Sequence, residues 1–323
     1  MKKITVSAPG KLMLFGEHAV VYGRPCIVTT VGQRMKATVE LTNDSMFHLE
    51  APDVSVSGYK KPMSELGQGD IPKGAKFVEI AILNFAKKHK IKGGIKISTK
   101  SEFNSQFGFG SSSASTVCVL KALSQLTRAK LSNKKIFDLS YKTVLDIQGK
   151  GSGFDVAAAI YGGTLYFVIG GKVIQPLNLK SLPLIIGYSG IKADTVELMA
   201  EVSKKAEKYP KVIDDIYTNI GELVQEAKKA LLKADFQTVG ELMNFNQGYL
   251  SSLGVSSGKL EAMIHASRNA GAYGAKLSGA GVGDCMIAFA STKSIKAVEQ
   301  AINKAGGQTI KIPANVEGVK IEV

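Results

Sequence analysis

The stretch FGFGSSSAST, residues 107–116, places two glycines and three consecutive serines directly before a segment of helical character. Glycine lets the backbone approach a ligand closely, because it has no side chain to obstruct the contact. The first turn of a helix offers unpaired N–H donors and a partial positive charge, which together favour an anion. Serine hydroxyls at the same place can also coordinate a metal ion held on that anion. Residues 108–113 are therefore predicted to bind phosphate.

Three other stretches are similarly rich in glycine, and they are APGKLMLFGEHAVVYG at 8–23, GKGSGFD at 149–155 and KLSGAGVGDC at 276–285. Any one of them alone could be an ordinary turn or helix cap. The chain contains no GxxxxGK[ST] motif, no GxGxxG after a strand and no protein-kinase motif set. A phosphate site of another type is therefore indicated.

The elements that must position these stretches alternate along the first half of the chain. Short β-branched or alternating runs predict strands, and helices are expected over 113–127 and 133–147, the second capped by Ser132 or Asn133. The run GTLYFVIGGKVIQPL predicts a hairpin that turns at Gly170-Gly171. Hairpins with helices grouped between them favour an α+β fold over a doubly wound parallel sheet.

A second domain is expected to begin near residue 180, where Pro183 precedes the new strand LIIGYS and long helical segments follow. The chain is thus divided into residues 1–180, which contain the predicted phosphate loop, and residues 181–323, which contain the last glycine-rich stretch. A length of 323 residues is sufficient for two domains with sizeable cores.

The composition excludes several classes of protein. Hydrophobic residues make up 45% of the chain, which is too apolar for disorder. Three scattered cysteines argue against a disulfide framework and a metal cluster, and no signal peptide or membrane span is evident. The net charge of +14 is spread over helix faces without interleaved aromatic residues, so nucleic acid and membrane are not expected partners. These features predict a cytoplasmic protein.

Three of the glycine-rich stretches together resemble the signature motifs of the superfamily of galactokinases, homoserine kinases, mevalonate kinases and phosphomevalonate kinases, the GHMP kinases. APGKLMLFGEHAVVYG resembles the first motif, GFGSSSAS the second (usually PxGxGLGSSAA) and GAKLSGAGVGDCMIAF the third. Residues 243–277 extend the likeness toward the archaeal mevalonate kinases. The resemblance implies an N-terminal α/β domain like that of ribosomal protein S5, followed by a ferredoxin-like α+β domain.

Members of this superfamily transfer the γ-phosphoryl group of ATP to the hydroxyl of a small molecule, mostly by positioning and charge neutralisation. The resemblance implies a phosphotransferase that converts (R)-mevalonate to 5-phosphomevalonate in isoprenoid synthesis. ATP and Mg²⁺ are the implied cofactors. Mevalonate and ATP are the expected partners, and a homodimer is allowed.

The resemblance also implies two catalytic residues. Asp155 in GSGFD falls where the family places its catalytic aspartate, and Lys11 after Pro9-Gly10 matches the lysine of the first motif. By this likeness Asp155 takes the proton of the substrate hydroxyl, while Lys11 pairs with Asp155 and the transferred phosphoryl group. Taken alone, Asp155 would be interpreted as a helix N-cap and Lys11 as a surface lysine.

The binding residues follow from the same motifs. The residues expected around the ATP phosphates are Gly108, Phe109, Gly110, Ser111, Ser112 and Ser113. The residues expected around the substrate are Glu17, His18, Thr195, Ser278, Gly279, Ala280 and Gly281. Ser112 is the implied hydroxyl ligand of Mg²⁺, an ion that binds phosphate oxygens, waters and few protein groups.

The chain departs from the family pattern at two places in the phosphate and metal site. NSQF at 104–107 replaces the usual Pro and first Gly of the second motif. Many mevalonate kinases carry a glutamate ligand of Mg²⁺ eleven residues before the catalytic aspartate, where this chain has Val144. Asp146 is the predicted substitute, reached by an unwound helix end; otherwise ATP, Ser112 and water hold the ion.

The acceptor is the third departure. QGKGSGFD and GVGDC are closer to the motifs of phosphomevalonate kinases, and Lys150 and Lys192 could meet an additional substrate phosphate. The first motif and residues 243–277 favour mevalonate. Phosphomevalonate or another small alcohol stays an alternative, as does a non-catalytic basic protein of the same fold.

Overall fold

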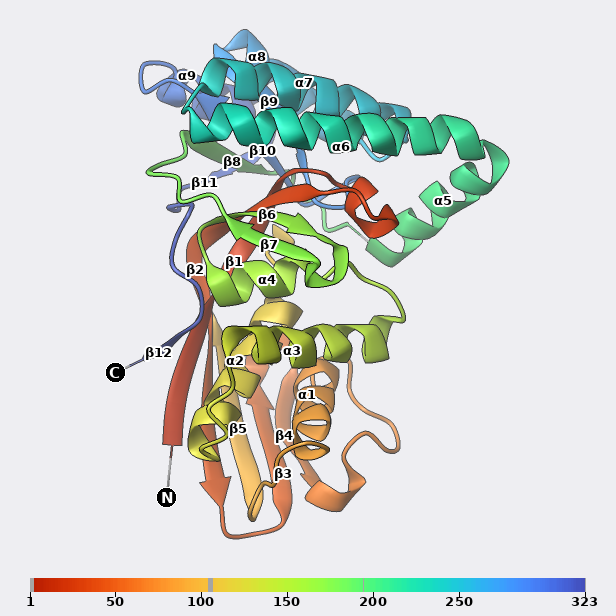
Figure 1. Cartoon of the computed structure of the whole chain (residues 1–323). Helices are drawn as coiled ribbons and strands as arrows, with labels where there is room; N and C mark the ends of the chain where they lie inside the picture. The colour runs from red at the N-terminus through yellow and green to blue at the C-terminus, as the bar shows by residue number, and fades with distance from the viewer. Residues whose placement is uncertain (1–2, 104–106, 194, 323) are drawn as a thin grey trace.

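The computed structural model describes residues 3–103, 107–193 and 195–322, and these form two sheets with separate helical layers (Figure 1). The first sheet has the order β12-β1-β2-β5-β3-β4, with β6 paired to β2 and β7 paired to β6. Its strands are β1 (Lys3–Phe15), β2 (Cys26–Thr42), β3 (Met46–Ala51), β4 (Val56–Pro62), β5 (Gly94–Ser101), β6 (Thr164–Val168), β7 (Val173–Pro176) and β12 (Lys320–Glu322). Within this sheet only β3 and β5 run parallel among the described pairs.

Four helices accompany the first sheet: α1 (Lys76–Ala86), α2 (Ser111–Leu126), α3 (Asn133–Gln148) and α4 (Phe154–Tyr161). The helix expected over 113–127 begins two residues earlier, and the helix expected over 133–147 ends one residue later. Ser132 caps α3 as predicted, because its side chain accepts the backbone N–H of Lys135. The predicted hairpin is confirmed by β6 and β7, which pair antiparallel around Gly170-Gly171.

The second sheet has the order β11-β8-β10-β9, in which every described pair is antiparallel. Its strands are β8 (Leu184–Tyr188), β9 (Ala272–Ser278), β10 (Cys285–Ala290) and β11 (Gln308–Ile310). Its helices are α5 (Thr195–Lys208), α6 (Pro210–Leu232), α7 (Phe236–Ser252), α8 (Gly258–Asn269) and α9 (Ile295–Lys304). Antiparallel pairing predominates in both sheets, which confirms the expected α+β class.

The two sheets with their helices meet at the end of β1 that is away from the N-terminus, where β1 contacts α6, α7 and β9 (Figure 1). The second sheet begins along the chain with β8 at Leu184, and the boundary near residue 180 stays a prediction. The chain then returns, because β12 pairs with β1 at the edge of the first sheet. No helix of the described chain is long and apolar enough to cross a membrane.

Candidate active site

The predicted phosphate loop leads directly into α2. Gly108 and Gly110 have φ of 70° and 82°, left-handed values that glycine adopts at little cost. Gly110 is the residue before α2, and no side chain of the described chain caps this helix end. The first turn also has no acidic residue, so its N–H groups remain available to an anion. This geometry fits a nucleotide phosphate, as the sequence predicts.

Lys11 lies against this loop. Its backbone N–H donates to the carbonyl of Phe109 at 3.0 Å, and its Nζ donates to the carbonyl of Gly108 at 2.7 Å. Nζ also lies 5.4 Å from the centre of the Phe154 ring. Burial lowers the pKa of the Lys11 ammonium, while the nearby carboxylates of Asp155 and Asp284 oppose that shift. The structure therefore places one cation beside the glycine loop.

Asp155 reaches the same place from α4. The N-cap of α4 is Gly153, so Asp155 is inside the first turn and does not serve as the cap. Its Oδ2 accepts a hydrogen bond from the hydroxyl of Ser113, the third residue of α2. A side-chain carbon added at Gly110 would lie 3.2 Å from Lys11 Cε and 3.8 Å from Asp155 Cβ. The glycine thus lies between the lysine and the carboxylate.

Other predicted phosphate ligands differ in what they can offer. The Phe109 side chain is buried beside Phe103 and Phe107, so only its backbone is available to a ligand. Ser111 and Ser112 are half-buried residues, and neither side-chain hydroxyl has a hydrogen-bond partner among the described residues. Ser112 is therefore free to bind an additional group, as its predicted role requires.

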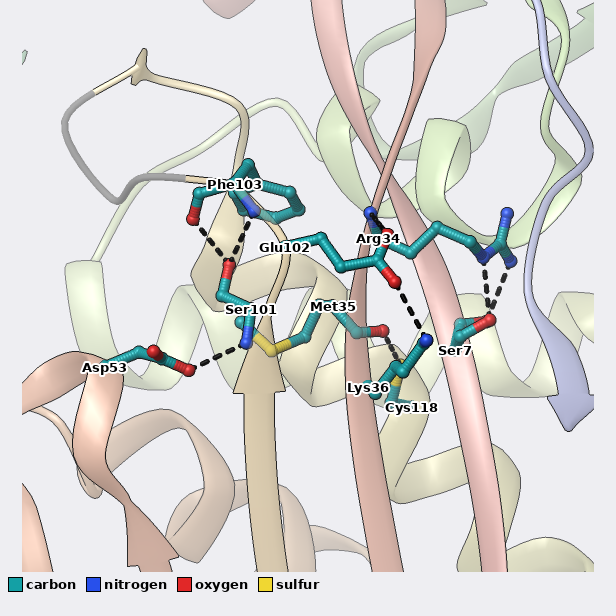
Figure 2. Close-up of polar contacts among 9 residues, drawn as sticks. All are labelled: Ser7, Arg34, Met35, Lys36, Asp53, Ser101, Glu102, Phe103 and Cys118. Atoms are coloured by element: carbon teal, nitrogen blue, oxygen red, sulfur yellow. Dashed lines mark hydrogen bonds and ion pairs between the residues drawn. The ribbon is translucent and has the colours of Figure 1, made fainter. Parts of the chain in front are cut away.

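The strand that leads to the phosphate loop is held by polar contacts at the end of β5 (Figure 2). Glu102 pairs with Lys36 at 2.8 Å through Oε1 and accepts the backbone N–H of Arg34 at 3.1 Å through Oε2. One residue earlier, the backbone N–H of Ser101 donates to Asp53 Oδ2 at 2.7 Å. Residues 104–106, where the second motif departs from the family pattern, lie outside the described residues.

Glu17 and His18 lie at the contact between the two domains. Glu17 forms a fully buried ion pair with Lys276 of β9, and its second oxygen has no partner among the described residues. Burial raises the pKa of Glu17 and lowers that of Lys276, and their mutual attraction opposes both shifts. His18 donates from Nε2 to the carbonyl of Ala280 at 2.7 Å.

Burial lowers the pKa of His18, which favours the neutral imidazole, and the hydrogen bond to Ala280 opposes that shift. With the proton on Nε2, Nδ1 is a buried acceptor that no described residue satisfies. His18 also has a left-handed backbone, with φ of 60°. These features leave Glu17 and His18 each with one buried polar atom available for a ligand.

In the third motif, the space beside the backbone is open at Gly279 and filled at Gly281. Ser278 accepts from the N–H of Met13 at 3.1 Å and donates to its carbonyl at 2.9 Å, so this hydroxyl joins β9 to β1. Gly279 has φ of 101°, and nothing lies within 4 Å of a carbon added there. Such a carbon at Gly281 would lie 2.0 Å from the carbonyl oxygen of Val255. Gly279 therefore faces open space and Gly281 is tightly packed.

Sequence reasoning missed Asp284 and Lys276 as members of this region. Asp284 follows the glycines of the third motif with φ of 55°, and Val282 two residues earlier has φ of 62°. Left-handed backbone is uncommon outside glycine and unusual for a β-branched residue. The only sequence signal was the GVGDC segment, whose likeness to phosphomevalonate kinases pointed to the acceptor. The partner of Lys276, Glu17, is distant in sequence.

The predicted metal ligand Asp146 is engaged by other side chains. Asp146 pairs with Lys142 at 2.7 Å and accepts from Asn84 at 2.8 Å. Because α3 continues to Gln148, the helix end at Asp146 is not unwound. Val144 is buried, and within the described ranges no three acidic, histidine or cysteine side chains gather as a metal site. Thr195 begins α5, but its side chain lies outside the described residues.

Known proteins support the geometric description. A family described as GHMP kinases N terminal domain matches residues 76–163, and one described as GHMP kinases C terminal matches residues 227–308. The mevalonate kinase of Pyrococcus furiosus is 38% identical over 334 residues, which cover 99% of this chain and 98% of the relative. That of Thermococcus onnurineus is 37% identical, with 99% and 98% covered.

A solved structure extends the likeness to three dimensions. The crystal structure of the Methanococcus jannaschii mevalonate kinase matches with a TM-score of 0.81 at 28% identity, covering 97% of this chain and 98% of that chain. The expected fold and relatives are thus confirmed over nearly the whole length.

Proposed function

The chain belongs to the GHMP kinase family, and from that membership we propose that it transfers the γ-phosphoryl group of ATP to the 5-hydroxyl of (R)-mevalonate, with release of ADP and 5-phosphomevalonate. Full-length relatives named mevalonate kinase support this acceptor. The observation that carries the proposal is the convergence of Lys11, Asp155 and Ser113 at the glycine loop.

Each residue has a task that its position supports. Asp155 takes the proton from the hydroxyl as the oxygen attacks phosphorus, and the Ser113 hydroxyl orients the carboxylate. Lys11 stabilises negative charge on the transferred phosphoryl group, since its ammonium lies beside the loop that holds the phosphates. The N–H groups at the start of α2 bind phosphate oxygens without side-chain movement.

The substrate contacts are proposed for Glu17, His18 and the third motif. The unsatisfied Glu17 oxygen and His18 Nδ1 can accept hydrogen bonds from substrate hydroxyls. Gly279 leaves room beside Ala280 and Gly281 for the substrate backbone. Ser278 and Thr195 complete the proposed set, with Ser278 supporting β9 through Met13.

Mg²⁺ is the proposed metal ion, and when bound it would neutralise the negative charge of the ATP phosphates. The hydroxyl of the half-buried Ser112, which has no partner among the described residues, fits a hard cation held on the phosphates. Asp146 remains the second predicted ligand, although it would have to leave Lys142 and Asn84. A cytoplasmic location is proposed on the three buried, unpaired cysteines.

The experiment is a panel of acceptors with ATP and Mg²⁺, in which ADP release is followed for mevalonate, phosphomevalonate and related alcohols. We expect turnover with mevalonate and a much smaller rate with phosphomevalonate. Preference for phosphomevalonate would reassign the acceptor and agree with the GVGDC segment. Absence of ADP with every acceptor, together with salt-sensitive polynucleotide binding, would favour the non-catalytic basic protein.

A further inference from the structure

Asp284 projects from the third motif onto the phosphate loop of the other domain. The residue is 8% exposed, and its Oδ1 accepts the backbone N–H of Ala193 at 3.1 Å. Its Oδ2 has no hydrogen-bond partner among the described residues. A side-chain carbon added at Gly108 would lie 2.5 Å from this same Oδ2. A carboxylate oxygen of a largely buried residue therefore lies directly against the backbone that is proposed to receive phosphate.

The charges around this oxygen call for a cation. Asp155 and Asp284 approach Lys11 from different domains, and both interact with its ammonium. Lys11 and Lys192, which both interact with Asp284, carry fewer charges than two carboxylates and a bound triphosphate, so Asp284 would repel phosphate unless more positive charge arrived. Mg²⁺ takes oxygen ligands from one or two carboxylates together with substrate phosphates. The backbone strain at φ of 55° also fits a residue kept for function.

Many mevalonate kinases carry a glutamate ligand of Mg²⁺ at the position of Val144, and this chain has no metal-binding side chain there. Val144 is buried and apolar, and a carbon added at Gly151 would lie 3.1 Å from its Cγ1. Asp146 uses both oxygens for Lys142 and one also for Asn84. Neither residue presents an unengaged oxygen as Asp284 does.

We propose that Asp284 Oδ2 would bind the Mg²⁺ ion carried by the nucleotide, together with the Ser112 hydroxyl, in place of the glutamate absent at Val144. The proposal rests on the proposed ATP-dependent function. It makes the third motif a participant in nucleotide binding, so that the metal ion joins the two domains at the phosphate loop.

The test compares Asp284→Asn with Asp146→Asn by calorimetric titration of a non-hydrolysable ATP analogue, with and without Mg²⁺. Asparagine tolerates left-handed backbone, and its amide oxygen can still accept the N–H of Ala193. We expect Asp284→Asn to keep or improve the metal-free affinity, because a negative charge is removed. The gain in affinity that Mg²⁺ gives should fall about tenfold or more. Asp146→Asn should keep that gain.

A wild-type Mg²⁺ gain in folded Asp284→Asn overturns the proposal, and loss of the gain in Asp146→Asn alone assigns the site to Asp146. Thermal unfolding establishes that each variant is folded, and Asp284→Gly, which suits the left-handed backbone, repeats the test without an amide. Electron paramagnetic resonance of Mn²⁺ with the analogue gives a second readout of the same ligand loss. No acceptor is present in these titrations. If mevalonate is not the acceptor, the gain in analogue affinity from Mg²⁺ is unaffected. If Asp284 is not the Mg²⁺ ligand, the result of the acceptor panel is unaffected.

Discussion

The phosphate loop at 107–113 and the third motif at 276–285 reach one site from two domains, but their backbones are held differently. In the phosphate loop the left-handed positions are glycines, Gly108 and Gly110. In the third motif Val282 and Asp284 also adopt left-handed backbone, with φ of 62° and 55°. The strand before the phosphate loop is held by the exposed pair Lys36–Glu102, whereas the third motif begins at the fully buried pair Lys276–Glu17.

This difference indicates a division of labour. Glycines leave the phosphate loop free of strain and open to a ligand, so substitutions there should act on binding and turnover. The third motif accepts strain and buried charge because contacts such as Ser278 with Met13 fix it to β1. Substitutions at its anchoring contacts, as distinct from Asp284, should act mainly on stability. The division is testable, because variants at these contacts should leave analogue binding nearly unchanged, whereas variants of the phosphate loop should alter binding or turnover.

The largest effect is expected from Asp155→Asn on the phosphate-loop side. Removing the general base should lower kcat about 10²–10⁴-fold, while the affinity for the ATP analogue and the unfolding midpoint change little. Asparagine keeps an oxygen that can accept from Ser113. ADP release with mevalonate is the measurement, and Asp138→Asn, an exposed α3 carboxylate paired with Lys134, is the control. Turnover near the wild-type rate would reject Asp155 as the base.

The largest effect on stability is expected from Lys276→Met in the third motif. The substitution leaves the carboxylate of Glu17 buried without its cation, which costs about 3–5 kcal/mol of unfolding free energy. Urea unfolding measures the loss, and Glu17→Gln in the same chain should recover a substantial part of it. Lys36→Met, at the exposed pair with Glu102, should cost less than about 1 kcal/mol. Equal losses of unfolding free energy in Lys276→Met and Lys36→Met would contradict the proposed difference between the buried and the exposed ion pair.

Gly110→Ala examines the phosphate loop backbone. A left-handed alanine costs about 1–2 kcal/mol, and its methyl would press on Lys11 Cε from 3.2 Å. Gly58→Ala is the matched control, because Gly58 has φ of 63° and nothing within 4 Å of an added carbon. Both variants should lose similar stability in urea, but only Gly110→Ala should weaken analogue binding. Weakening in both variants would contradict a role specific to the loop.

Val282→Gly should show the strain in the third motif as a gain. Removing the strain of a left-handed valine should stabilise the folded state by about 1–2 kcal/mol. The greater conformational freedom of glycine in the unfolded state should cost about 0.5–1 kcal/mol. The expected net gain is therefore about 1 kcal/mol or less. Val173→Gly is the control, because both valines are 40% exposed and Val173 lies in strand β7 without positive φ. Destabilisation of both variants by the same amount would show that Val282 is unstrained.

The same contrast explains which features the sequence could predict. Helices α2 and α3 and the β6–β7 hairpin depend on local periodicity, caps and turns, and all three were predicted within two residues. The phosphate loop could be predicted because its residue types have specific uses: glycine adopts left-handed backbone, and serine provides hydroxyls. Antiparallel pairing from hairpins likewise indicated the α+β class.

The remaining features depend on contacts between distant residues. Glu17 and Lys276 are separated by 259 residues, so no local pattern announces their buried pair. Asp284 gains its importance from Gly108 in the other domain, and an aspartate after glycines otherwise suggests a turn. The metal ligand predicted at Asp146 depended on an unwound helix end, whereas the observed α3 continues past that residue. Tertiary packing decides such cases.

The smallest effect is expected from Glu102→Gln, which alters the exposed ion pair with Lys36 that precedes the phosphate loop. The hydrogen bond from Lys36 holds the pKa of Glu102 below its ordinary value. A lowered pKa in the folded state means that the carboxylate stabilises the protein above the ordinary pKa of about 4.3, and that this contribution is lost as the pH falls through the folded pKa. The side chain is 39% exposed, so solvent screening keeps the contribution under about 1 kcal/mol. Urea midpoints at about pH 6 and pH 3 should show the variant weaker than wild type at the higher pH and nearly equal at the lower. A constant gap for Glu102→Gln would mean that its contact with Lys36 contributes nothing through charge.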